Sequence, residues 1–251
     1  MLARERAELG FSILELMVAM AIFLVLCGAM FGLLQVSQQK YSSETQLSGA
    51  VQDARLALDQ IVRDFNVSGY PSLEMFSSQP TLPVTYALGP VAWSPNYPSA
   101  VCTIGTGGGG SCTTPGDYDL ILETRLGTDP SVSWVRYQLI STTLYRGVVQ
   151  KSSTDPATAT SGSGVMVPFL ANVVNAVNPN GSPQPIFRYT CDTPGGPIAC
   201  ASSAAGLANS PLNIRDVDVT LIVATPQRDM QTQVVKFVEL NGRGHRSNPT
   251  N

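Results

Sequence analysis

Charged side chains are scarce in this sequence. Of its 251 residues, 13% are Asp, Glu, Lys or Arg, and the formal net charge is −3. This weak, acidic balance argues against a protein that holds a nucleic acid by its phosphates. The one histidine, His245, stands in a polar tail from Asn241 to Asn251 that we expect to be frayed. It has no serine or cysteine nucleophile motif around it, so a catalytic triad finds no support.

The motifs of common enzyme classes are also missing. The chain has no Gly-x-Ser-x-Gly, no His-Glu-x-x-His and no dinucleotide-binding fingerprint. The glycine run at 107–110 lacks the Lys-Ser/Thr of a phosphate-binding loop, which favours a flexible loop tip. We therefore expect no enzyme and no cofactor, and keep a membrane-anchored enzyme only as a remote alternative.

Three carboxylates, Asp117, Asp119 and Glu123, lie close together in the sequence. A calcium site is one interpretation, but calcium takes about six to eight oxygen ligands and this stretch supplies far fewer. If a strand runs from Tyr118 to Arg125, Asp119 and Glu123 share one of its faces. A solvated strand face then explains both carboxylates, and we expect no metal.

Five cysteines indicate disulfides in an oxidising compartment. Cys27 lies inside a long apolar run and is interpreted as a small apolar residue. The other four form two closely spaced pairs, and four cysteines allow three connectivities. We favour Cys102 with Cys112 and Cys191 with Cys200, because short loops cost least to close. The spacing is not Cys-x-x-Cys, which argues against zinc.

The apolar run extends from Phe11 to Gln39 and contains one carboxylate or amine side chain, Glu15. About 20 apolar residues are enough for a helix to span a bilayer. A charged acid in such a helix is unfavourable by a few kcal/mol unless it finds a cation, so it is a functional candidate. A cut between Gly10 and Phe11 would create that cation, a free amine one helical turn from Glu15.

The stretch Gly-Phe-Ser-Ile-Leu-Glu-Leu-Met-Val-Ala-Met at 10–20 resembles the class III signal of type IV pilins and type II secretion pseudopilins. The resemblance implies that a prepilin peptidase cuts after Gly10, that the Phe11 amine is methylated, and that Glu15 guides docking into a filament. It also implies a single-pass protein of the bacterial inner membrane with a periplasmic head. The partners would be membrane lipid, an inner-membrane assembly platform and other pilins or pseudopilins. An ordinary cleaved signal and a generic anchor are the alternatives.

Gly28 and Gly32 have the spacing of a small-xxx-small face on which another helix can approach closely. The alternative is that glycine is simply common in membrane helices. Major pilins often carry a proline where this chain has Gly32, so the chain departs from them here.

Beyond the apolar run the pattern becomes amphipathic. Apolar residues recur every three or four positions, at Leu47, Val51, Ala54, Leu58, Ile61 and Phe65. We expect this stripe to pack on a sheet of the same chain, with a coiled coil as the alternative. The predicted organisation is a leader at 1–10, a membrane or filament-core half of the helix at 11–36, an amphipathic half at 37–68 and a β-rich head at 69–251.

The head begins with an irregular, Pro- and Gly-rich segment from Pro71 to Gly116, with one strand expected near Pro83 to Leu88. Alternating or apolar runs then predict strands at Tyr118–Arg125, Ser133–Ile140, Thr143–Val149, Ile186–Thr190, Ile214–Ala224 and Thr232–Leu240, with a short packed segment at Val165–Val177. One long helix followed by such strands predicts an α+β fold in which an antiparallel sheet covers the helix. The spacing of the strand motifs is similar to that of minor pilins of the PilW type and of large J-type pseudopilins.

The resemblance favours a minor subunit that primes or caps a filament at its tip, because the head is large and the helix lacks the proline. A second hypothesis is a binding module at the tip, which uses the two cysteine loops to hold DNA, a surface or a secreted substrate. The acidic balance argues against DNA.

Overall fold

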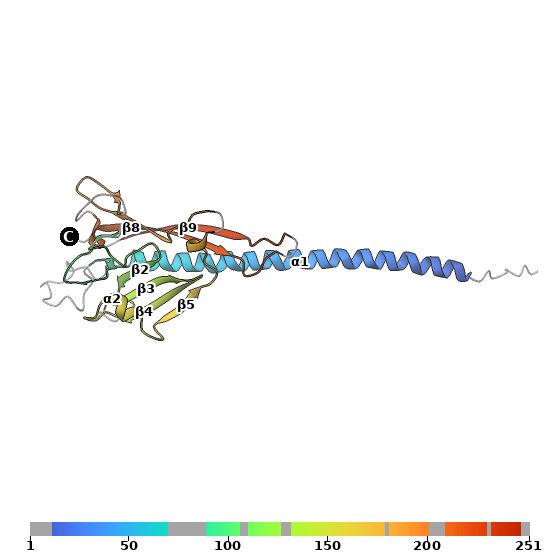
Figure 1. The fold of residues 1–251 in the computed structure, drawn as a ribbon, viewed down its shortest axis with the longest axis horizontal. Helices are drawn as coiled ribbons and strands as arrows, with labels where there is room; N and C mark the ends of the chain where they lie inside the picture. Colours follow the sequence, from blue (N-terminus) through green and yellow to red (C-terminus); the bar gives the residue numbers. More distant parts are fainter. Residues whose placement is uncertain are drawn as a thin grey trace, which may run out of the picture.

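The computed structural model describes residues 12–69, 89–105, 110–126, 132–178, 181–200, 209–229 and 232–246. In this part of the chain, one long helix projects from a head that contains two antiparallel sheets (Figure 1). The α+β class, with a long N-terminal helix packed on antiparallel strands, is therefore confirmed. The head has two sheets rather than the single sheet that the strand pattern suggested.

Helix α1 spans Ile13–Asn66, which is about 80 Å at 1.5 Å per residue. Its N-terminus is capped by Ser12, whose hydroxyl accepts a hydrogen bond from the backbone N–H of Leu14 at 3.3 Å. The Glu15 carboxylate accepts in turn from the backbone N–H of Ser12 at 3.4 Å, which completes a capping box. No proline interrupts the run, so the helix continues until Val67.

The first sheet has the order β1-β2-β3-β4-β5 and the second has the order β7-β6-β8-β9. The strands of the first sheet are β1 Val91–Ala92, β2 Asp119–Thr124, β3 Ser133–Ile140, β4 Thr143–Gln150 and β5 Met166–Leu170. Those of the second are β6 Phe187–Cys191, β7 Ile198–Ala199, β8 Ile214–Ala224 and β9 Phe237–His245. The short helices are α2 Pro156–Thr160, η2 Asn175–Val177 and η4 Pro211–Asn213.

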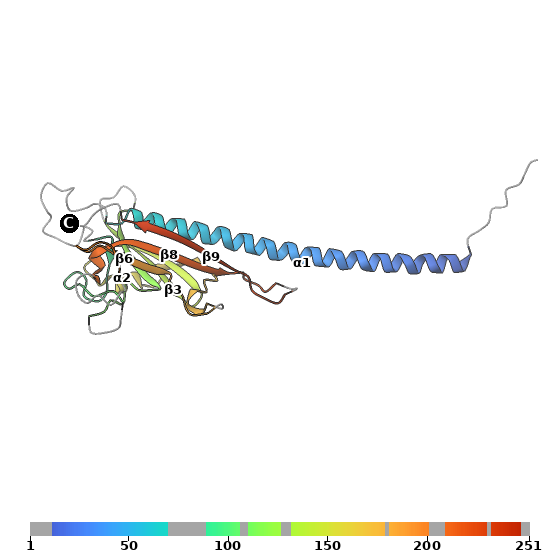
Figure 2. The same ribbon diagram turned by 90° about the horizontal axis from the view of Figure 1, so that it is seen from above.

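The C-terminal half of α1 packs along β8 and β9 and contacts the first sheet through β2 and β5 (Figure 2). The predicted stripe is buried from Ala54 onward, and Ile61 and Phe65 have 0% and 1% of their surface exposed. Two glycines of β9 allow the helix to come close. A Cβ atom on Gly244 would lie 2.7 Å from the Phe65 ring, and one on Gly242 would lie 2.9 Å from Leu58. The stripe is therefore occupied by the chain's own head.

The strand boundaries match the predicted ones where the apolar pattern of the side chains is clear. Ser133–Ile140 and Ile214–Ala224 have the predicted boundaries. The last strand was predicted wrongly, because β9 begins at Phe237 and continues through His245. The frayed tail expected from Asn241 is thus wrong as far as His245, which pairs with Asp216 of β8. Glycines occupy the buried face of β9 near its end, so the sequence shows no hydrophobic pattern at these positions.

The segment before β2 covers the outer face of the first sheet. Residues 89–105 and 110–116 pack there with α2, around a second apolar cluster. That cluster contains Ala92, Trp93, Tyr97, Cys102, Ile121 and Trp134. The strand predicted near Pro83 to Leu88 lies outside the described residues.

Candidate functional site

Glu15 stands in the first turn of α1, at the end of the helix farthest from the head (Figure 1). Its side chain is exposed, and its carboxylate is engaged by the backbone N–H of Ser12. The predicted cleavage residues Gly10 and Phe11 precede this turn and lie outside the described residues. In the sequence, this carboxylate stands four positions after the residue whose amine the cut would release.

The apolar half of α1 makes no contact with the described part of the head (Figure 2). Its most apolar 18-residue window has a mean hydropathy of 2.6, and none of that window is buried. By length and composition, α1 is able to cross a membrane. Its large exposed side chains are Ile13, Leu14, Leu16, Met17, Val18, Met20, Ile22, Phe23, Leu24, Val25, Leu26, Met30, Phe31, Leu33, Leu34 and Val36.

Gly28 and Gly32 lie on this uncovered half. A Cβ atom built on either glycine would have no described atom within 4 Å, apart from the backbone of the helix itself. The pair is thus available to a neighbouring helix, as a small-xxx-small face requires. Cys27, beside Gly28, is a free thiol.

An ion pair between the buried Asp64 and the partly exposed Arg146 ties α1 to the first sheet. Asp64 Oδ2 accepts from Arg146 Nη2 at 2.8 Å and from the Tyr137 hydroxyl at 2.6 Å. Burial, followed by the charge of Asp64, raises the pKa of Tyr137, which stays a neutral donor. The predicted apolar stripe did not include Asp64, so this role was missed. Its position three residues after Ile61 puts it on the buried side of the helix, which is the signal that could have revealed it.

The loop between β8 and β9 reaches the middle of α1. The Ser43 hydroxyl donates to Asp229 Oδ2 at 3.0 Å, and Lys236 Nζ lies 3.1 Å from Glu44 Oε1. These contacts stand shortly after the apolar run ends. They divide α1 into a free N-terminal half and a half that is fixed to the head.

The three carboxylates considered for calcium are not gathered into a metal site. Among the described residues, no group of three or more His, Cys, Asp or Glu side chains could hold an ion. Asp119 is paired with Arg136 at 2.6 Å, while Asp117 is exposed. Glu123 has none of its surface exposed, so the prediction that this strand face is solvated is wrong. Helix α2 and the loop that precedes β2 cover this face. The alternation of residues along the strand could not indicate this cover.

Glu123 instead belongs to a buried polar cluster. Lys151 Nζ lies 2.9 Å from Glu123 Oε1, and the indole N–H of Trp134 donates to the same oxygen at 3.0 Å. The Tyr97 hydroxyl donates to Glu123 and accepts from Lys151. Burial lowers the pKa of Lys151, although the charge of Glu123 opposes this. The sequence analysis missed Lys151, which stands directly after β4 in a segment that reads as a polar loop.

The structure forms two disulfides, Cys102–Cys112 and Cys191–Cys200, which are the local pairs that the sequence favours. Each closes a short loop of the head. Cys191 ends β6 and pairs with Ile214 at the start of β8, close to the C-terminal end of α1. The second disulfide therefore lies at the end of the head that is distant from the apolar half of α1.

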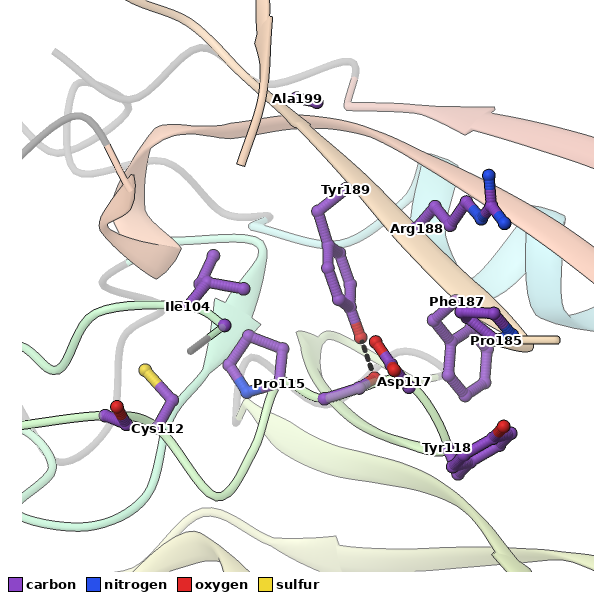
Figure 3. Close-up of a pocket in the computed structure, with 13 residues that line it drawn as sticks. Ile104, Cys112, Pro115, Asp117, Tyr118, Pro185, Phe187, Arg188, Tyr189 and Ala199 are labelled. Carbon is purple, nitrogen blue, oxygen red and sulfur yellow. Dashed lines mark hydrogen bonds between the residues drawn. The ribbon is translucent and has the colours of Figure 1, made fainter. Parts of the chain in front are cut away.

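A cavity of about 760 Å³ lies where the two disulfide loops meet the two sheets (Figure 3). Its walls combine apolar and aromatic groups with a few polar ones. The lining residues are Ile104, Gly105, Ser111, Cys112, Pro115, Gly116, Asp117, Tyr118, Pro185, Phe187, Arg188, Tyr189 and Ala199. The Tyr189 hydroxyl donates to the Gly116 carbonyl at 2.6 Å, which fixes the ring within the cavity.

Residues 6–31 match the family model of the prokaryotic N-terminal methylation motif. The match includes the bond between Gly10 and Phe11, Glu15, and most of the apolar half of α1. It supports a type IV pilin-like protein, a pilin or a pseudopilin, and points to a structural protein. It also implies processing by a prepilin peptidase and assembly with other pilins. No curated protein and no solved structure matches the chain.

Proposed function

We propose that this chain is a subunit of a type IV pilus or of a type II secretion pseudopilus. The observation that carries the proposal is the free apolar half of α1, which begins at the methylation motif and is joined rigidly to a folded head. Burying a large apolar side chain is favourable by about 1.5–3 kcal/mol, so the exposed side chains together represent tens of kcal/mol. Such a surface requires lipid before assembly and neighbouring helices afterwards.

Glu15 supplies the register of assembly. A lone carboxylate in the hydrocarbon of a membrane is unfavourable by about 2.5–3.5 kcal/mol at the helix centre, and less near the interface. Cleavage after Gly10 creates an amine at Phe11, and methylation leaves its charge in place. In a filament core of low dielectric, attraction between this amine and a neighbour's Glu15 is much stronger than in water. The pair therefore favours one axial position of the incoming helix.

The test is the mass and N-terminal sequence of the protein extracted from membranes of cells with and without prepilin peptidase. We expect a chain that begins at N-methylated Phe11 only when the peptidase is present. A chain that still begins at Met1 in both strains, or one cut beyond Leu34, would overturn the proposal. Gly10→Val is the matched control, since a bulky residue before the cut should leave the precursor intact.

Assembly is tested by Glu15→Gln, which keeps the shape of the side chain and removes its charge. We expect this variant to be processed and to stay in the membrane fraction, but to be lost from sheared filaments. Glu44→Gln removes the same charge from an exposed position on the same helix and should assemble normally. Equal incorporation of the two variants would refute the role of Glu15.

We further propose that the subunit is a minor one that occupies the filament tip. The two-sheet head with its disulfide loops is bulky, and a single-copy tip subunit need not repeat sideways around a shaft. Quantitative mass spectrometry of sheared filaments should give far fewer copies than of the major subunit, and labelled heads should be found at filament ends. Labels distributed along the shaft would contradict the tip position.

A further inference from the structure

The cavity between the disulfide loops is independent of the filament contacts. It opens on the head, whereas Glu15, Gly28 and Gly32 lie on the free half of α1. Its volume, about 760 Å³, is within the range of sites that enclose small organic ligands. Proline, isoleucine and disulfide groups on one side give it an apolar wall (Figure 3). A ligand for this site therefore has an apolar part.

Three aromatic side chains form the opposite part of the cavity. Phe187 and Tyr189 point inward from β6, and Tyr118 stands beside them from the segment that leads into β2 (Figure 3). Phe187 is fully buried and Tyr189 is 6% exposed, so the ring surface open to a ligand belongs mainly to Tyr118, with a small part from Tyr189. Aromatic rings carry partial negative charge on their faces, so they attract cations that lie within about 6 Å of the ring centre. An anion is disfavoured over the same ring faces. The aromatic content thus favours a positively charged ligand.

Asp117 adds a full negative charge at the rim. Its carboxylate lies beside the Tyr189 hydroxyl in Figure 3. After burial, the charge of Asp117 raises the pKa of Tyr118, and the charges of Asp119 and then Asp117 raise the pKa of Tyr189. Within the described ranges, this carboxylate has no ion-pair or hydrogen-bond partner, whereas nearby Asp119 is paired with Arg136. The Asp117 charge is therefore available to a ligand.

Among the described residues that line the cavity, Arg188 is the one cation. Arg188 lies between Phe187 and Tyr189 on β6, and successive side chains of a strand point to opposite faces, so the Arg188 side chain points to the other face of β6. In Figure 3 its guanidinium extends away from Asp117, into solvent. The field inside the cavity is thus set by Asp117 and the rings.

We propose that this cavity binds an organic cation, an ammonium or guanidinium group carried on an apolar stem. The stem packs against Pro115 and Ile104, and the cationic end lies near Tyr118, Tyr189 and Asp117 (Figure 3). Two sources carry this chemistry, a free amine and the lysine or arginine side chain of another protein. The proposal does not depend on the filament role, because it concerns only the head.

The experiment is isothermal titration calorimetry on the full chain in a non-ionic detergent. The free-amine probe is n-hexylammonium, with n-hexanol as its neutral counterpart. The side-chain probe is the capped peptide acetyl-Ala-Lys-Ala-amide, with the same peptide carrying norleucine in place of lysine. We expect at least one cation to bind about tenfold or more tightly than its neutral counterpart. If only the peptide shows this preference the source is a protein side chain, and if hexylammonium shows it a free amine suffices.

Two variants locate the site. Asp117→Asn should reduce the preference to within about twofold, while Asp59→Asn, which removes the same charge from an exposed position on α1, should leave it unchanged. Equal affinity for the cations and their neutral counterparts in the unmodified protein would overturn the proposal. So would a preference that survives Asp117→Asn. The comparison in the unmodified protein keeps the test valid even if Asp117→Asn does not fold.

Discussion

The buried pair of Lys151 and Glu123 makes the sharpest prediction about the stability of the head. The two side chains have 1% and 0% of their surface exposed, and Glu123 also accepts hydrogen bonds from Trp134 and Tyr97. Lys151→Met leaves the Glu123 carboxylate buried without its cation. Breaking a buried pair in this way typically lowers the free energy of unfolding by about 3–5 kcal/mol. This is a large share of the roughly 5–15 kcal/mol that stabilises an ordinary domain.

Removal of both charges should be much less harmful. Glu123→Gln alone removes the carboxylate that lies 2.9 Å from the Lys151 ammonium and should lower the free energy of unfolding by a similar amount. In the double variant, methionine fills the space of the lysine stem, and glutamine still accepts from Trp134 and Tyr97. Replacement of a buried ion pair by neutral groups of similar size is often neutral or stabilising. We therefore expect the double variant to unfold within about 1–2 kcal/mol of the unmodified protein.

Urea unfolding followed by tryptophan fluorescence is the assay. The chain has two tryptophans, Trp93 and Trp134, and both lie in the cluster that contains Tyr97, so the signal reports on this region. Lys236→Met is the control, because Lys236 pairs with Glu44 at the surface and its loss should change the midpoint little. The reasoning is refuted if the single variants unfold within 1 kcal/mol of the unmodified protein, or if the effects of the two substitutions simply add.

Three further predictions concern the rest of the head. Gly244→Ala places a Cβ atom against α1 and should lower the free energy of unfolding by about 1–3 kcal/mol in urea titrations. Gly195→Ala is the control: the nearest atom to its new Cβ lies at 3.8 Å, so the free energy of unfolding should change little. Loss of the Cys191–Cys200 disulfide, by replacement of both residues with serine, should lower it by about 2–3 kcal/mol through the freed loop, and an unchanged midpoint would contradict this. Burial alone would raise the pKa of Asp216, but hydrogen bonds from its basic partners outweigh burial and lower this pKa in the folded protein. The ionised Asp216 therefore stabilises the fold above the usual pKa of 3.8, and this stabilisation is lost as the pH falls below that value. Thermal unfolding midpoints of Asp216→Asn should therefore lie below those of the unmodified protein at pH 6 and converge with them below about pH 4, whereas a constant gap would contradict the shift.

Local patterns in the sequence predicted the parts of the molecule that depend on neighbouring residues. The continuous helix follows from an apolar run and an amphipathic stripe that no proline interrupts. The Ser12 and Glu15 cap was not predicted, although it too uses residues only three positions apart. The disulfides join cysteines only nine or ten positions apart, so the entropy of loop closure favours these local pairs. The boundaries of β3 and β8 follow from side chains that alternate along one strand.

Contacts between distant parts of the chain could not be predicted in this way. Asp64 meets Arg146 across 82 positions, and the difference between a buried and a solvated carboxylate at Glu123 depends on which loop covers the strand. The end of β9 was missed because its glycines are selected by the closeness of α1, not by hydrophobicity.

By itself, the sequence determined the N-terminal half of α1 and the residues just before it: a methylation motif, one carboxylate and an apolar helix, all encoded in consecutive residues. Only the tertiary structure decided which charges of the head are buried, how the strands divide into two sheets, and that a cavity opens between the disulfide loops. The physical reason is range. Helix formation and hydrophobicity are properties of a short stretch, whereas burial, pairing and cavity shape arise when segments far apart in the chain exclude water from one another.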